Sequence, residues 1–125
     1  MWEKMGNRIS LQKWEDETMK YKIYENGTVK ECLQKLLDDG YMPLTLKQIT
    51  TAKNNGKIKD VWYNSSTFYF WETGDIRDAT KEELQGILNN TIKGRVLFVG
   101  LGDYSGRVGD DSLSDSGRFV GVKRK

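Results

Sequence analysis

The chain has 125 residues, with 20 basic and 18 acidic side chains, one cysteine and no histidine. Charges of both signs are interspersed and the net charge is only +2, which argues against a nucleic-acid-binding protein, because such proteins gather a basic excess on one face. One cysteine excludes an internal disulfide, and the lack of histidine excludes Ser-His-Asp and Cys-His catalysis and removes the commonest zinc ligand.

A length of 125 residues suits one core, so we expect a single domain over 1–125. The first 24 residues contain no apolar stretch typical of a signal peptide, and no segment is apolar and long enough to span a membrane. Residues 1–18 carry Trp2 and Trp14 but match no helix or strand pattern. We therefore expect no direct membrane insertion and no cofactor, and the sequence leaves the oligomeric state open.

The first predicted element is a strand over residues 19–24. Met19, Tyr21 and Ile23 alternate with other side chains there and share one face. The pair Asn26-Gly27 then predicts a turn, because both residues tolerate left-handed backbone.

Three helices are predicted from their first residues and from apolar spacing. Capping boxes that start at Thr28 and Thr80 open two of them, and Thr45 caps another in between. Gly40 ends the first helix. Few residues separate the first two helices, so we expect these to pack as neighbours. Cys32 lies on the apolar face of the first helix, which favours a small core residue over a reactive thiol.

The most β-prone stretch covers residues 61–71, where Asn64-Ser65-Ser66 could bend it into two short strands. Further apolar runs predict strands over 95–99 and 118–122. The order of strands and helices indicates an α+β fold with a small, mostly antiparallel sheet.

A long segment, GLGDYSGRVGDDSLSDSG over residues 100–117, separates the last two predicted strands and matches neither pattern. Its glycine spacing is not that of a phosphate-binding loop, and its excess of aspartates repels phosphate. Asp110, Asp111, Ser112 and Asp115 offer oxygen ligands, so a bound cation is one alternative. A recognition surface is a second, because binding loops favour Tyr, Ser, Gly, Asp and Arg, and a solvated loop without a partner is a third.

The residue types of the segment 98–122 set it apart from the rest of the chain. None of its 25 residues is Lys, Glu, Gln, Met or Trp, whereas 32 of the 97 residues before it are. Every codon for those five types ends in a purine. Each residue from 98 to 122 can be encoded by a codon that ends in a pyrimidine. This bias in residue types favours a recognition surface over an ordinary solvated loop.

Residues 94–125, GRVLFVGLGDYSGRVGDDSLSDSGRFVGVKRK, resemble the C-terminal variable region of diversity-generating retroelement target proteins. Upstream, GYMPLTLKQITTAKNNGKI (40–58) and WYNSSTFYF (62–70) resemble the scaffold of archaeal and viral members. The resemblance covers about Tyr41 to Lys125. In that family, mutated template adenines turn AAY codons into NNY codons, which implies the repertoire seen at 98–122.

The resemblance implies a C-type lectin-like fold, in which a small twisted sheet is flanked by two main helices and carries a long C-terminal loop, with the terminal strands paired. The calcium motifs EPN and WND and the disulfides of animal C-type lectins are missing from this sequence. Calcium-dependent carbohydrate binding is therefore not implied, and we expect no metal site.

By the same resemblance, nine residues within 98–122 form the ligand-binding surface. They are Asp103, Tyr104, Ser105, Arg107, Val108, Asp110, Asp111, Ser114 and Asp115.

Six further residues have two readings each. Gly94, Arg95, Gly117 and Arg118 match the framework on either side of the variable region, or are turn glycines and solvated arginines. Trp62 and Tyr63 border the site, or are core residues of a β-run.

The implied function is that of a non-enzymatic, receptor- or adhesin-like protein whose loop is diversified to bind changing targets. Its partner would be a protein or other macromolecule on a target cell, not a nucleic acid, and the resemblance suggests a virion or cell surface as its location. The alternative is an archaeal or viral structural or interaction protein with a fixed binding loop. An enzyme is disfavoured, since no paired-carboxylate motif or nucleophile elbow is present.

Overall fold

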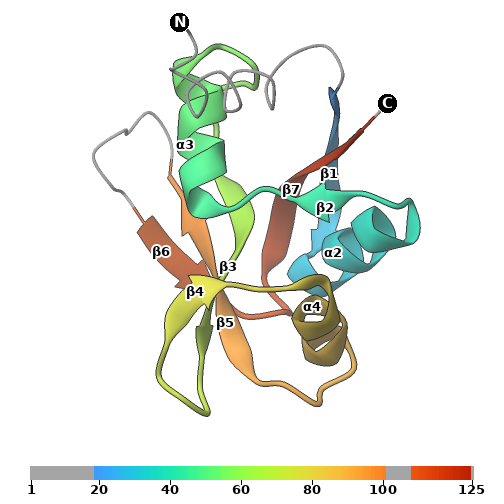
Figure 1. Cartoon of the computed structure of the whole chain (residues 1–125), viewed down its shortest axis with the longest axis vertical. Coiled ribbons are helices and arrows are strands. Elements are labelled where there is room, and N and C mark those ends of the chain that lie inside the picture. The colour runs from blue at the N-terminus through green and yellow to red at the C-terminus, as the bar shows by residue number, and fades with distance from the viewer. Residues whose placement is uncertain (1–18, 101–107, 125) are drawn as a thin grey trace, which may run out of the picture.

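A computed structural model describes residues 19–100 and 108–124, which form an α+β fold with three helices and one mixed sheet (Figure 1). The helices are α2 (Val29–Asp38), α3 (Leu46–Asn54) and α4 (Lys81–Leu88). The strands are β1 (Met19–Thr28), β2 (Met42–Pro43), β3 (Tyr63–Phe70), β4 (Ile76–Asp78), β5 (Gly94–Val99), β6 (Val108–Asp111) and β7 (Ser116–Arg124).

The strands of the sheet run in the order β1-β7-β3-β5-β6, with β2 beside β7 and β4 beside β3. All pairings are antiparallel except that of β3 with β7, which is a single parallel bridge between Asn64 and Phe119. The expected α+β class and the mostly antiparallel sheet are confirmed. The three helices predicted from capping and apolar spacing are present and similar in length, whereas the resemblance implied two main helices.

Each helix begins at a threonine that caps it. The hydroxyls of Thr28, Thr45 and Thr80 accept a hydrogen bond from the third helical N–H, and the residue at that position caps in return. This confirms all three predicted starts. Gly40 follows the first helix at φ +84°, a conformation that glycine adopts without strain, and so confirms the predicted end.

Two apolar clusters sandwich the sheet. In β7, Phe119 faces the cluster that contains α2 and α4, whereas its neighbour Val120 faces the cluster that contains α3. Alternation along a strand thus assigns α2 and α3 to opposite faces. The expectation that these two helices pack as neighbours is wrong, because the sheet lies between them.

Two predicted interruptions are absorbed within strands. At Asn26-Gly27 the chain does not turn. Asn26 has φ +69° and the pairing register shifts between Glu25 and Gly27, so β1 continues through a bulge. Residues 64–66 likewise do not divide the β-run, since β3 continues past a register shift between Asn64 and Phe68.

Part of the segment 100–117, which the sequence predicted to be a loop, forms strands. Residues 108–111 form β6 and pair with β5, and residues 116–117 already belong to β7. Backbone pairing at a sheet edge tolerates small and acidic residues. Glycine at 109 leaves room for the Phe98 ring, because a Cβ at this position would lie 2.6 Å from Cζ of Phe98 and the ring would have to move.

Candidate functional site

The β5–β6 hairpin fixes the two ends of residues 101–107. Val99 pairs with Val108 across the antiparallel ladder. The carbonyl oxygen of Gly100, one residue further, accepts a 2.8 Å hydrogen bond from the Nζ of Lys53 at the end of α3. The segment therefore leaves and rejoins the sheet at adjacent points held by backbone and side-chain bonds.

Lys53 is a buried cation beneath this point. Its side chain is 1% exposed, and its Nζ lies 3.3 Å from Oδ1 of Asp60 and 5.7 Å from the centroid of the Tyr63 ring. Burying an ammonium group is unfavourable unless it is paired and hydrogen-bonded. Here the carboxylate, the ring and the Gly100 carbonyl together satisfy it.

Of the nine predicted ligand-binding residues, four lie outside the described residues: Asp103, Tyr104, Ser105 and Arg107. Val108 and Asp110 lie in β6 opposite Val99 and Leu97, on the face that α3 covers further along the sheet. Both are exposed. Asp110 accepts a 2.6 Å hydrogen bond from Nε of Arg95.

Asp111 is half-buried beside the central strand β3. It accepts a 2.9 Å hydrogen bond from the side-chain amide of Asn64, and that amide oxygen accepts one of 2.9 Å from the backbone N–H of Arg118. Burial raises the pKa of Asp111, an effect that the Asn64 hydrogen bond opposes. Asp111 therefore joins β6, β3 and β7, and is less available to a ligand than Asp110.

The turn between β6 and β7 carries the last two predicted residues, Ser114 and Asp115, and both are exposed. The Asp115 carboxylate accepts a hydrogen bond from the Ser112 N–H at 2.8 Å, and its carbonyl accepts one from the Val29 N–H at 2.8 Å. The turn is thus fixed on the first residue of α2.

Trp62 and Tyr63 have different environments. Tyr63 is 1% exposed within the apolar cluster under α3, so its core reading is confirmed. Trp62 is half-exposed. The Arg118 guanidinium lies 4.6 Å from its ring centroid and reaches Oε1 of Glu25 at 3.1 Å. Trp62, Arg118, Glu25 and Ser114 line a pocket of about 430 Å³ at this end of the sheet.

The four framework residues are neither turn glycines nor solvated arginines. Gly94 and Gly117 lie within strands, and a Cβ on Gly117 would come within 2.7 Å of the Val29 backbone. Arg95 and Arg118 are half-buried and ion-paired. Their positions agree with a framework role in holding β5 and β7.

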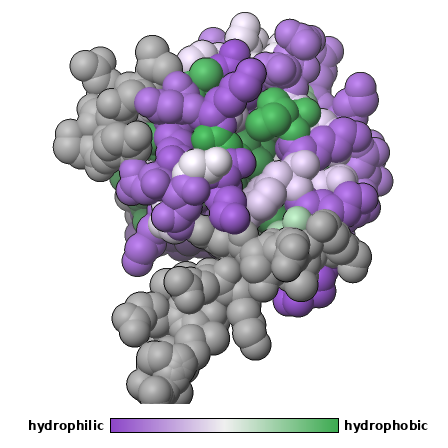
Figure 2. Space-filling view, turned by 90° about the horizontal axis from the view of Figure 1, so that it is seen from above, coloured by the Kyte–Doolittle hydropathy of each residue, from purple (hydrophilic) through white to green (hydrophobic). Residues whose placement is uncertain are grey.

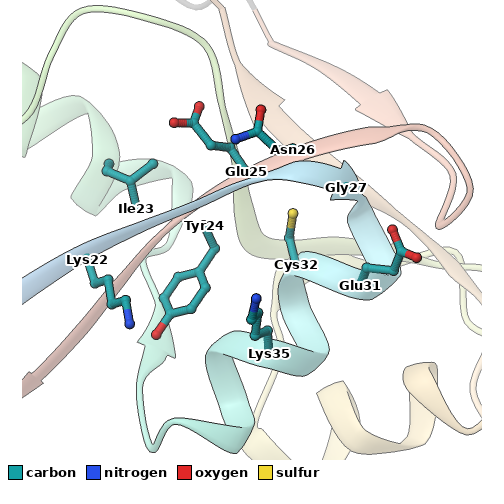
Figure 3. Close-up of a pocket in the computed structure, with 9 residues that line it drawn as sticks. All are labelled: Lys22, Ile23, Tyr24, Glu25, Asn26, Gly27, Glu31, Cys32 and Lys35. Atoms are coloured by element: carbon teal, nitrogen blue, oxygen red, sulfur yellow. The ribbon is translucent and has the colours of Figure 1, made fainter.

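A further pocket of about 530 Å³ lies between β1 and α2 (Figure 3). Lys22, Tyr24 and Lys35 lie toward one side of it, away from Glu31. Cys32 is 4% exposed in the apolar cluster and burial raises the pKa of its thiol, so the predicted core role is confirmed.

Across residues 19–100 and 108–124, no three acidic or cysteine side chains come close enough together to hold a metal ion. Within the same ranges, no helix has the length and apolar character needed to cross a membrane.

Compared with known proteins, the chain matches no protein-family model and no curated protein sequence.

Three residues that hold the candidate site in place were not identified as functional from the sequence: Lys53, Asn64 and Glu25. Lys53 reads as an ordinary helix-terminal lysine, Asn64 as a turn former and Glu25 as a solvated charge. Their partners Gly100, Asp111 and Arg118 are 47, 47 and 93 positions away. No local pattern encodes such distant pairs, although a polar tract in the middle of a β-run is a signal for buried hydrogen bonding.

Proposed function

We propose that the chain is a ligand-binding protein with a C-type lectin-like scaffold, and that a retroelement diversifies exposed positions of its segment 98–122. The pairing of the first and last described strands, β1 and β7, supports the C-type lectin-like assignment, because the resemblance implies paired terminal strands. The composition of 98–122 supports diversification.

The observation that carries the proposal is the fixed base of residues 101–107. Val99 pairs with Val108, and the buried Lys53 holds the Gly100 carbonyl. A scaffold fixed at both ends of a segment tolerates changes between those ends, as binding loops on rigid frameworks do. Tyr104 and Arg107 are the expected anchors of binding energy, with Ser, Gly and Asp adjusting specificity.

The geometry restricts which positions can vary. Positions of 98–122 that the fold requires are buried, are glycines whose Cβ would come within 3.0 Å of another atom, or, for Asp111, are held by the Asn64 hydrogen bond. They are Val99, Gly109, Asp111, Gly117, Phe119, Val120 and Gly121. Described positions that are exposed, and so free to change, are Val108, Asp110, Ser114, Asp115 and Ser116. Together with residues 103–107, these form the proposed variable set.

The proposed partner is a protein or other macromolecule on a target cell, and the proposed location is a virion or a cell surface. No catalytic step is proposed. The specificity would lie in side chains that change without altering the scaffold, so different variants would bind different partners.

One observation favours the alternative, a structural or interaction protein with a fixed loop. Asp110 is paired with Arg95, and the Asp115 carboxylate and carbonyl both hold the β6–β7 turn. On this alternative, these aspartates are structural residues and the whole segment is constant.

Sequencing the 3′ end of the gene across a natural population, together with the flanking DNA, separates the two. The proposal expects substitutions at codons of the variable set, aligned with adenines in a nearby near-copy, and none at Gly117, Phe119 or Val120. If the segment varies no more than the helices do, diversification is refuted and the fixed-loop alternative stands.

A matched laboratory test uses two sets of substitutions in the full chain. Replacing Asp103, Tyr104, Ser105 and Arg107 together by alanine should leave the melting temperature within about 3 °C, because the Val99–Val108 pair and the Lys53–Gly100 hydrogen bond hold the scaffold without these side chains. The control, Phe119→Ala with Val120→Ala, should abolish cooperative unfolding. Loss of folding in the first set would contradict the proposed scaffold.

A further inference from the structure

A groove of about 460 Å³ lies along β1, on the same side of the sheet as α3. Its apolar part is formed by Tyr21 and Ile23 of β1, by Ile58 and Val61 of the α3–β3 connection, and by the ring of Tyr63. We propose that this β1 groove is a second binding site, and that it takes an acidic peptide segment that carries a large apolar side chain.

The apolar part of the groove is open to solvent. Ile23 is 41% exposed, whereas Tyr63 beneath it is 1% exposed. Figure 2 shows apolar surface near the middle of the face seen from above, with polar residues beside it. An exposed apolar patch with a polar rim is typical of an interaction site, because leaving it in water is unfavourable.

The rim of the β1 groove determines the charge of the partner. Lys57, Lys59 and Arg118 are cations that line it, and within the part of the chain that the structure describes Glu25 is the one carboxylate that does so. That carboxylate already accepts a hydrogen bond from Arg118 at 3.1 Å. The two lysines therefore provide a positive rim, with apolar stems that can cover a bound side chain. Charge complementarity favours an acidic partner over a basic one.

This groove differs from the proposed variable surface in its composition. Among residues 19–100 and 108–124, nine line the groove. Eight of these precede residue 98, and the ninth is Arg118, whose guanidinium lies over the Trp62 ring. Its partner should therefore be the same for every loop variant. The inference does not rest on diversification, since Arg118 is the only described residue of 98–122 that lines the groove, and it lies outside the proposed variable set.

The test titrates the ¹⁵N-labelled full chain with the pentapeptide acetyl-Glu-Asp-Leu-Phe-Glu-amide and follows amide shifts by NMR. We expect saturable shifts at Ile23, Ile58 and Val61. The neutral peptide acetyl-Gln-Asn-Leu-Phe-Gln-amide should bind about fivefold more weakly. No shift at these residues at about 5 mM peptide, or equal binding of the neutral peptide, would overturn the proposal.

Matched variants locate the site. Lys57→Glu with Lys59→Glu should weaken binding about tenfold, whereas the equal charge change Lys47→Glu with Lys93→Glu should not. Ile23→Thr should weaken it about threefold, and Ile76→Thr, at an exposed isoleucine outside the groove, should leave it unchanged. Binding that these groove variants leave intact would refute the site and would not bear on the loop.

Discussion

At the scale of single residues, Asn64 links three strands, because its side chain in β3 bonds both β6 and β7. It is 1% exposed at the single bridge that pairs β3 with β7, and its amide donates to Asp111 and accepts from the Arg118 backbone. A residue with one donor and one acceptor on the same plane suits this position. Aspartate and leucine each lack one or both of these functions.

Replacing Asn64 by leucine should lower the free energy of unfolding by about 3 kcal/mol, because a buried N–H and a half-buried carboxylate lose their partner. Urea unfolding monitored by circular dichroism measures this. Asn54→Ala, an exposed site in α3, serves as the control and should change stability by less than about 0.5 kcal/mol. An equally small effect at Asn64 would show that the hydrogen bonds are dispensable.

Glu83 provides a pH test at the same scale. Its carboxylate accepts two hydrogen bonds from Arg77, of 2.8 and 2.6 Å, and one from the N-cap N–H of Thr80, which together lower its pKa to about 2. A depressed folded-state pKa stabilises the protein above the ordinary pKa of 4.5, and this contribution is lost as the pH falls from there to about 2.

We expect Glu83→Gln to lower stability by about 1 kcal/mol at pH 7, a modest figure because solvent screens the partly exposed Arg77 partner. The glutamine oxygen retains the capping hydrogen bond, whereas its NH2 group cannot accept from Arg77, so the charge and one Arg77 hydrogen bond are removed together. The difference between the two proteins should vanish near pH 2 in urea titrations. A difference that persists at that pH would assign the effect to packing instead.

At the scale of elements, the β5–β6 hairpin depends on a missing side chain. The Phe98 ring lies over Gly109 and meets the Trp62 ring edge-on, with centroids 6.4 Å apart. A methyl group at Gly109 would push the Phe98 ring toward Trp62, so the pair of strands and the tryptophan environment are linked.

Gly109→Ala should destabilise the protein by about 2 kcal/mol and alter the near-ultraviolet circular dichroism of Trp62. In a Phe98→Leu background the smaller side chain leaves room, so the cost of the same alanine should fall below about 1 kcal/mol. An equal cost in both backgrounds would mean that Phe98 is not the obstacle.

Elements with local signals could be predicted from the sequence, and elements that depend on distant partners could not. Each helix start is encoded by a threonine and the residue three positions after it. The starts predicted at Thr28, Thr45 and Thr80 are confirmed. Strand β6 carries no apolar alternation and exists because β5 offers a backbone edge. The opposite placement of α2 and α3 is likewise set by the sheet that passes between them.

The candidate site divides in the same way. Its location within 98–122 follows from composition, and exposure at Val108, Asp110, Ser114 and Asp115 agrees with it. The structural role of Asp111 did not follow, because Asn64 is 47 positions away. The anchoring of Gly100 by Lys53 was hidden for the same reason.

At the scale of the whole molecule, β7 is the strand on which the fold closes. It lies between β1 and β3 in the sheet, and its side chains enter both apolar clusters. Its partners in β1 are about a hundred positions earlier in the chain. The two ends of the chain must therefore come together before β1 and β7 can pair.

A chain that ends at Gly117 should therefore fail to fold, with no cooperative thermal transition and with exposed apolar surface that binds a hydrophobic dye. Removing only residues 124–125 is the control and should retain most of the stability, since Arg124 is the last residue of β7 and contributes only the end pair of the ladder, with Met19. Cooperative unfolding of the shorter chain would show that β1 and β3 suffice.

Strand β7 follows the loop in the chain, so any change in the loop codons must leave the codons of β7 translated. A stop codon anywhere between residues 98 and 117 would produce a truncated chain without β7. Such a chain would not fold, and proteases would degrade it. All three stop codons end in a purine. A mutational process that varies the first two bases and keeps a pyrimidine in the third can therefore change the loop without ever terminating translation before β7.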